Sequence, residues 1–175
     1  GYEFIAVGRS RISGRVAQQI RIISRDNTRY SYQLWVDEET GIPLKLNMLD
    51  LKGQLVKQVQ VSQLQVTEQP DPYFSRINHA MLPAVSTPTK TSHQHGWRVA
   101  YLPAGMREVK RNTHRLAVTG QVVEYAMLSD GLVEISIYVM PSASDDMQNN
   151  LYRHESKTLL TIVEGDVQVT VIGEI

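Results

Sequence analysis

Hydrophobic residues recur at every second position from Arg29 to Val36, and this period predicts a β-strand. Asp37–Gly41 then has the composition of a short hairpin loop, with Gly41 where a left-handed residue closes the turn, and Ile42–Leu46 returns. Because similar segments lie on both sides, we expect this strand in the middle of an antiparallel sheet. One face would carry Tyr30, Tyr32, Leu34 and Val36, and the other Arg29, Ser31, Gln33 and Trp35.

The first 66 residues repeat this pattern with turn signals between the segments, which predicts a five-stranded meander. The other strands are expected at Tyr2–Ile12, Arg15–Arg25, Ile42–Leu46 and Gln54–Val66. The last of these contains an irregularity, because Val59 and Val61 fall on one face while Leu64 and Val66 fall on the other. A bulge near Ser62 would bring all four to the core side.

Residues 67–95 interrupt the strands with four prolines among Ser, Thr and Gln residues. Only Pro72–Met81 is suited to a short helix, with proline near its first turn. We interpret 67–95 as a linker that lets two lobes adopt a mutual orientation without a large fixed interface. The predicted division is therefore a first lobe of residues 1–66, this linker, and a smaller C-terminal lobe of residues 96–175.

Strand patterns resume after Gly96, so the second lobe is also predicted to be mostly antiparallel sheet. Leu102–Gly105 has Pro and Gly at the second and fourth places of a type I turn, and Asp130-Gly131 is the strongest hairpin signal in the chain. Pro141–Tyr152 is expected to be a polar loop, with room for a helical turn. Expected strands are Trp97–Tyr101, Met106–Val118, Val122–Leu128, Leu132–Met140, Lys157–Val163 and Val167–Ile172.

Charge narrows the class of partner. Eighteen basic residues balance 18 acidic ones in a chain of 175, which argues against a dedicated nucleic-acid binder. The charges are unevenly placed: Gly8–Arg29 holds six arginines against one acid, whereas Leu116–Ile175 holds nine acids against two basic residues. This polarity suits a protein partner with its own charge pattern, and an unevenly charged solvated surface is the alternative.

The sequence offers little catalytic chemistry. It has no cysteine, no glycine-rich phosphate loop and no nucleophile elbow. His93 and His95 could bind a metal weakly, but no third ligand is apparent, so neither a metal site nor a cofactor is predicted. The adjacent acids Asp145 and Asp146 lie in a turn and suit a solvated surface better than acid–base catalysis. We therefore expect a binding protein rather than an enzyme.

Large amphipathic and basic side chains near the start of the second lobe are the candidate partner-binding residues. Core packing is the alternative for the aromatic members. The basic members form a basic strip, for which an ordinary solvated edge is the alternative; they are Arg107, Lys110, Arg111 and Arg115. The candidates are Trp97, Tyr101, Arg107, Lys110, Arg111 and Arg115.

Several motifs carry a family resemblance that runs along the whole chain. The segments RISGRVAQQIRIISRDNTRYSYQLWVDEETGIPLKLNMLD, GWRVAYLPAGM, YAMLSDGLVEISIYV and VTVIGEI resemble RseB/MucB, the periplasmic regulators of the envelope-stress sigma factor. Family members begin with a signal peptide and the first half of a lipoprotein-carrier-like half-barrel, and they continue with a Pro-Thr-Ala segment. This sequence has none of the three and begins inside a strand pattern, so we expect a fragment.

The resemblance implies a function and a fold. Residues 1–66 would form the second half of the half-barrel, with Tyr30, Tyr32, Leu34 and Val36 as candidate lipid-binding residues. Such proteins bind the periplasmic part of a membrane-anchored anti-sigma factor and shield it from the site-1 protease, and lipid or lipopolysaccharide relieves that inhibition. The alternative is a periplasmic lipoprotein or lipid carrier that uses the same concave sheet. We also expect residues 1–66 to pair with another copy or with a separate N-terminal piece.

Overall fold

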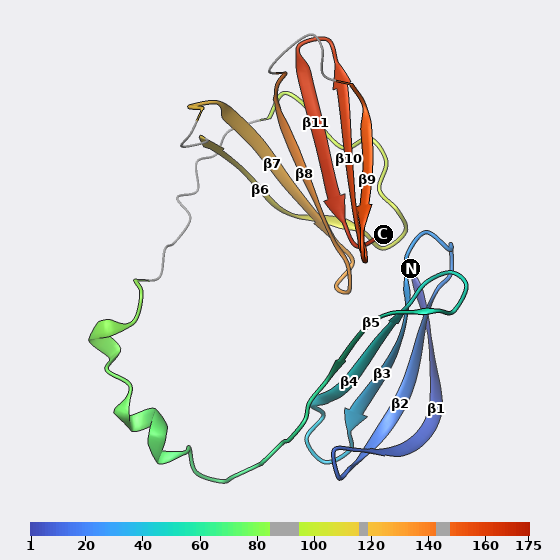
Figure 1. The fold of residues 1–175 in the computed structure, drawn as a ribbon, viewed down its shortest axis with the longest axis vertical. Helices are drawn as coiled ribbons and strands as arrows, with labels where there is room; N and C mark the ends of the chain where they lie inside the picture. The colour runs from blue at the N-terminus through green and yellow to red at the C-terminus, as the bar shows by residue number, and fades with distance from the viewer. Residues whose placement is uncertain (85–94, 116–118, 143–147) are drawn as a thin grey trace.

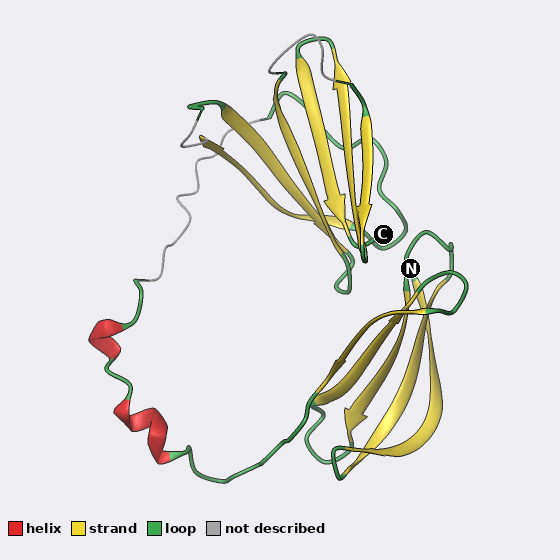
Figure 2. Cartoon of the chain, viewed as in Figure 1, coloured by secondary structure: helices red, strands yellow, loops and turns green. Residues whose placement is uncertain are grey.

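A computed structural model describes residues 1–84, 95–115, 119–142 and 148–175, which form two antiparallel sheets (Figures 1 and 2). The mainly β architecture is as predicted. The first sheet contains β1 (Tyr2–Ile12), β2 (Arg15–Ser24), β3 (Ser31–Asp37), β4 (Pro43–Leu49) and β5 (Leu55–Gln60). The second contains β6 (Arg107–Arg115), β7 (Val122–Ser129), β8 (Glu134–Pro141), β9 (Asn150–His154), β10 (Lys157–Glu164) and β11 (Val167–Gly173).

The first sheet is the expected meander, in the order β1-β2-β3-β4-β5, with β3 in the middle. Its turns form where the sequence supplies residues that tolerate a left-handed backbone. Ser13 and Gly14 join β1 to β2 with φ of 52° and 78°, and Gly41 joins β3 to β4 with φ of 74°. Local turn chemistry therefore sets the register of these hairpins.

One face of the first sheet is apolar because apolar residues on it lie opposite one another across neighbouring strands. The first row is apolar in the four strands β1 to β4. Phe4 of β1 lies opposite Ile22, which lies opposite Tyr32, and Tyr32 lies opposite Met48. The next row on the same face is apolar in all five strands. It contains Ala6, Ile20, Leu34, Leu46 and Val59.

The opposite face is polar in its centre and closes a small core at one end. The side-chain amide of Asn47 donates to Gln33 at 3.0 Å and accepts from Gln58 at 2.8 Å, which links three strands. Trp35 lies on this face beside the buried Leu44. As predicted, Tyr32 and Trp35 therefore face opposite sides of the sheet.

The predicted bulge near Ser62 is wrong, because β5 ends at Gln60. The backbone N–H of Val61 donates to Leu44 at 2.8 Å, and Val61 and Leu64 then pack against the Trp35 core from outside the strand. Val59 and Val66 are each 54% exposed. The chain thus leaves the sheet instead of continuing it.

Residues 67–84 are exposed and contain two short 3₁₀ helices, η1 (Pro72–Arg76) and η2 (His79–Met81). Asp71 caps η1 by accepting from the backbone N–H of Tyr73 at 2.8 Å, with Pro72 in the first turn as expected. The predicted short helix is therefore present as two separate 3₁₀ turns. Figure 1 shows this green segment running outside both sheets.

The second sheet has the order β6-β7-β8-β11-β10-β9. The β7–β8 hairpin turns at Asp130-Gly131 as expected, and the predicted strands Lys157–Val163 and Val167–Ile172 are present as the β10–β11 hairpin. Strand β9 was not predicted, since it falls within and just after the segment interpreted as a polar loop. The expected helical turn there is not found in the described residues, and 143–147 lie outside them.

The expected strand at Trp97–Tyr101 is wrong, because this segment pairs with no strand among the described residues. Trp97 and Val99 instead pack on the core of the second sheet. The following turn lies one residue later than predicted, with the Met106 N–H donating to Pro103 at 3.0 Å and Gly105 at φ 84°. That turn delivers Met106 into the core, where it is 7% exposed.

The two sheets touch, which the linker interpretation did not anticipate. A single cluster of buried side chains draws on both of them, and the half-buried Tyr2, Tyr30 and Leu34 pack against it. The buried members are Ile22, Tyr32 and Met48 from the first sheet and Met106, Leu128, Val133, Ile135 and Ile137 from the second part of the chain.

Candidate functional site

A buried arginine joins the two sheets where they meet. Arg29 precedes β3, and its Nη1 lies 2.6 Å from Asp130 Oδ2 in the β7–β8 turn. Its Nη2 lies 2.8 Å from Asp26 Oδ2 in the loop before it. The side chains of Arg29 and Asp130 are only 1% and 3% exposed, so this ion pair is removed from solvent. The Tyr2 ring lies 5.0 Å from the Arg29 guanidinium and completes its surroundings.

Local structure orients both carboxylates. Asp26 accepts from the Ser24 hydroxyl and from the hydroxyl and backbone N–H of Thr28, which orders the β2–β3 loop. Asp130 accepts from the backbone N–H groups of Leu132 and Val133 through Oδ1, each at 2.9 Å, which leaves Oδ2 for Arg29. The Arg29 fork therefore meets two acceptors that their own turns already hold in place.

Where the two sheets meet, the buried carboxylate and guanidinium are ionised and the neighbouring tyrosine is neutral. Burial opposes the charge of Asp130, but the hydrogen bonds from Val133, Leu132 and Arg29 outweigh burial and lower its pKa. Burial also works against the charge of Arg29, yet Asp130 and Asp26 still raise the arginine pKa. Burial, assisted by nearby carboxylates, raises the pKa of Tyr32 to about 12, so its hydroxyl stays protonated at neutral pH.

A second, more exposed ion pair crosses the junction beside two cavities. Lys57 Nζ of β5 lies 3.3 Å from Glu174, which also accepts from the Ser156 hydroxyl at 2.9 Å. One cavity of about 540 Å³ is lined by Val56 and Lys57 from the first sheet and by residues of β9 and β10. Another of about 390 Å³ is lined by Arg29 and Tyr30 together with Arg153. The walls mix apolar and charged groups, which suits binding rather than catalysis.

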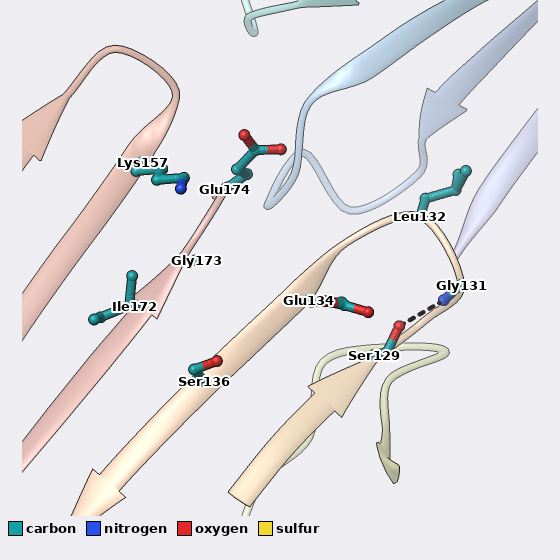
Figure 3. A pocket seen from close by; sticks show the side chains of 9 residues that line it. All are labelled: Ser129, Gly131, Leu132, Glu134, Ser136, Lys157, Ile172, Gly173 and Glu174. Carbon is teal, nitrogen blue, oxygen red and sulfur yellow. Dashed lines mark hydrogen bonds between the residues drawn. The ribbon is translucent and has the colours of Figure 1, made fainter. Parts of the chain in front are cut away.

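A third cavity, of about 400 Å³, lies almost wholly on the second sheet near the junction (Figure 3). Its Ser129 hydroxyl accepts from the backbone N–H of Gly131 at 3.0 Å and so fixes the hairpin. Glu134 and Lys157 also line it. Across the described residues, no three His, Asp or Glu side chains are placed to hold a metal ion.

Arg111 and Trp97, two of the predicted partner-binding residues, bind each other. The Arg111 guanidinium lies 4.7 Å from the Trp97 ring and donates to the Trp97 carbonyl at 3.2 Å. It is also held by Glu108 through two contacts of 2.6 Å, which raise the arginine pKa and lower that of the carboxyl. The side chains of Arg111 and Trp97 are both partly buried, so Arg111 is not a freely exposed charge.

The other four predicted partner-binding residues are exposed. Tyr101 is 78% exposed in the loop before β6, and Arg107 and Lys110 are exposed at the start of that strand. Arg115, at its far end, donates to the Gly120 carbonyl at 2.8 Å. The six candidates therefore separate into a fixed pair, an accessible group near the Pro103–Met106 turn, and one distant arginine.

The four predicted lipid-binding residues differ in accessibility. Tyr32 is 4% exposed and belongs to the core. Tyr30 and Leu34 are half-buried against the same cluster, and Val36 is half-buried on the same face as Leu34. The accessible apolar surface of that face instead lies at its edges, where Phe4 is 66% exposed.

Sequence reasoning missed Arg29, Asp130 and Tyr2 as junction residues. Each had another explanation, because Arg29 lay within a strand pattern and Asp130 marked a turn. The preference of buried charges for partners was the available signal, but burial itself was not visible in the sequence.

The family model described as "MucB/RseB N-terminal domain" matches residues 1–86, and that described as "MucB/RseB C-terminal domain" matches residues 91–175. The sigma-E factor regulatory protein RseB of Escherichia coli (strain K12) is 32% identical over 179 residues, covering 99% of this chain and 55% of that protein. The sigma factor AlgU regulatory protein MucB of Pseudomonas aeruginosa is also 32% identical, covering 99% of this chain and 56% of that protein. The chain thus spans about half the length of these relatives.

Solved structures of MucB match the whole fold. One described as MucB in complex with MucA(peri) superposes with a TM-score of 0.83 at 27% identity, covering 99% of this chain and 62% of that one. A crystal structure of MucB superposes with a TM-score of 0.64 at 26% identity, covering 99% and 58%. No helix among the described residues is long and apolar enough to cross a membrane.

Proposed function

This chain belongs to the MucB/RseB family, and on that premise we propose that it is a non-enzymatic negative regulator of envelope-stress sigma factor signalling. It would act in the periplasm by binding the periplasmic domain of a transmembrane anti-sigma factor and shielding that domain from site-1 proteolysis. Nucleic acid is not among the proposed partners.

One observation carries this proposal. The chain superposes over 99% of its length on MucB bound to MucA(peri) with a TM-score of 0.83. Both sheets and their mutual placement contribute to such a match, so a surface that spans the junction is available to a similar partner. We place the first contacts at Tyr101, Arg107 and Lys110, which are exposed beside the junction.

Protease protection tests the function directly. The purified periplasmic domain of the anti-sigma factor would be incubated with the site-1 protease, with and without this chain. Protection that saturates with increasing chain, and that an unrelated β-protein does not give, is the expected result. Unchanged cleavage at concentrations where the two proteins demonstrably bind would separate binding from shielding and refute the regulatory role.

We further propose that the apolar face of the first sheet binds an acyl lipid or the lipid part of lipopolysaccharide. The apolar rows across the sheet support this, together with exposed edge residues such as Phe4 and Val59. The alternative function, a lipoprotein or lipid carrier, would use the same face.

The two functions differ in thermodynamic linkage. If lipid relieves inhibition, lipid and anti-sigma domain must weaken each other's binding by the same factor, typically about 5-fold to 150-fold. A carrier needs no such linkage. Partner affinity would be measured by titration calorimetry with and without acylated lipid, and tight lipid binding that leaves partner affinity unchanged would favour the carrier.

The free edge of β1 supports a proposal about assembly. Phe4, Ile5 and Val7 are exposed along this strand, and an open apolar edge is a template for strand pairing. We propose that β1 pairs with a second copy or with a separate N-terminal polypeptide. Light scattering across a concentration series tests this, and a monomer throughout would refute self-pairing.

A further inference from the structure

Among the residues that the structure describes, two ion pairs cross the junction between the sheets, and their burial differs sharply. Lys57 and Glu174 are 52% and 27% exposed, so solvent screens their attraction and the pair contributes little. Arg29 and Asp130 are 1% and 3% exposed. If one of these residues lost its partner while it stayed buried, its charge would be uncompensated. Leaving a buried charge unpaired is among the most costly changes in a protein interior. Of the two pairs, Arg29–Asp130 therefore dominates the mutual placement of the sheets.

We infer that the Arg29–Asp130 pair is a junction latch that holds the two sheets in the arrangement competent to bind the partner. This inference rests on the proposed function, because it names the internal contact on which partner binding depends. In the structure the latch is closed, with Arg29 shared between Asp26 and Asp130. In the proposed open position, Asp26 alone would hold Arg29. Asp26 belongs to the same sheet as Arg29, so opening leaves the arginine a partner.

The latch is connected to the apolar face through two tyrosines. The Tyr2 ring contacts the Arg29 guanidinium and also meets the Tyr32 ring edge-on, with centroids 6.4 Å apart. Tyr32 is in turn a member of the apolar row that includes Phe4 and Ile22. A ligand that displaces either ring would thus remove part of the support of Arg29.

Hydrogen bonding at the latch is incomplete within the described protein. Tyr32 Oη and Arg29 Nε are buried and have no protein partner among the described residues. Buried donors without acceptors make an arrangement less favourable than a fully bonded one. The closed latch is therefore stabilised by its ion pair against an opposing cost, which is the condition for a contact that a ligand can open.

Two solved MucB structures match the chain to different degrees. The chain matches one with a TM-score of 0.83 and another with 0.64, although both cover 99% of the chain at 27% and 26% identity. The two MucB structures therefore differ in how closely they superpose on this chain, although their sequences are about equally distant from it.

Spin-label distance measurements on the full 175-residue chain test the latch. The sequence has no cysteine, so Gln60→Cys and Glu164→Cys place one label on each sheet at exposed positions. Asp130→Asn removes the charge that crosses the junction, and Asp26→Asn is the matched control because it removes the partner within one sheet. We expect a broader or shifted distance distribution for Asp130→Asn and a native one for Asp26→Asn. Native distributions for both variants, or equal changes in both, would overturn the latch.

Partner affinity separates failure of the latch from failure of the proposed function. If the unmodified chain binds the anti-sigma domain, Asp130→Asn should weaken binding by about 5-fold to 150-fold, and Asp26→Asn should not. Should the unmodified chain not bind, the function fails while the distance measurement still judges the latch. If Asp130→Asn does not fold, Arg29→Lys replaces it, since a lysine keeps the charge but lacks the fork that reaches both carboxylates. A native distance distribution for Arg29→Lys would then overturn the proposal.

Discussion

The Arg29 guanidinium lies 2.6 Å from the Asp130 carboxylate although 101 positions separate the two residues in the chain. Each belongs to a different sheet, and both are almost fully buried. A buried ion pair is not necessarily a net source of stability, because desolvation offsets the attraction. Its larger effect is on specificity, since a different placement of the sheets would separate Asp130 from Arg29.

Replacing Arg29 by Met is expected to destabilise the fold strongly. The side chain keeps much of its volume, but Asp130 remains buried without its counter-charge, which costs about 3–5 kcal/mol. Urea unfolding followed by tryptophan fluorescence measures the free energy of unfolding. Arg21→Met on the exposed surface of β2 is the matched control and should change it by less than about 0.5 kcal/mol. Equal losses for the two variants would contradict the assigned role of Arg29.

The contribution of Asp130 should depend on pH in one direction. Its pKa is lowered in the folded protein, so its contribution is present above the unfolded aspartate pKa of about 4 and is lost as pH falls through the folded value. The difference in unfolding free energy between the unmodified chain and Asp130→Asn should thus be constant from pH 7 to 5 and shrink below pH 4. A difference that grows on acidification would show that the sign is wrong.

Substitutions in the basic strip should separate association from stability. Arg107→Glu with Lys110→Glu changes exposed charges, so the association rate with the proposed anti-sigma partner should fall, more at low salt, with thermal stability retained. Arg111→Glu instead loses the Glu108 and Trp97 contacts and should cost about 1–2 kcal/mol. Stopped-flow association and thermal melts measure the two effects. An unchanged association rate at low ionic strength for the first variant would remove these residues from the interface.

Neighbouring residues of β1 test the proposed lipid surface. Phe4 extends the apolar row of Ile22 and Tyr32, whereas Ile5 lies opposite Arg21 on the other face. Phe4→Ser should weaken binding of a fluorescent acyl lipid several-fold, and Ile5→Ser should leave it unchanged. Both side chains are exposed, so neither change should unfold the sheet. Similar effects of the two substitutions would place lipid binding elsewhere.

Strand positions and turns followed from local chemistry and could therefore be predicted from the sequence. The two-residue period around Tyr32 identified the central strand, because alternation reports one buried and one less buried face. Gly41 and Gly131 adopt positive φ at the expected hairpins, since glycine has no Cβ to oppose it. These features depend on a few neighbouring residues.

The strand predictions were wrong for two segments. One segment lacks an apolar face and still forms a strand, and the other has an apolar face but pairs with no described strand. Every residue of Asn150–His154 is exposed, yet the segment forms β9 because the edge of β10 supplies its hydrogen bonds. Trp97 and Val99 bury their side chains as alternation indicated, yet their segment pairs with no described strand. Alternation thus reports burial and does not by itself report backbone pairing.

The sequence alone was enough to predict most strands of both sheets, several of their hairpins and a family resemblance that the comparisons confirmed, and its lack of cysteine excluded thiol chemistry. Tertiary packing was needed to establish that β11 pairs with β8, that Arg111 is held by Glu108 and Trp97, and that Arg29 meets Asp130. Local patterns arise from residues within a few positions of one another. The junction depends on how two separate sheets pack, and there burial turns ordinary turn and strand residues into an obligatory charge pair.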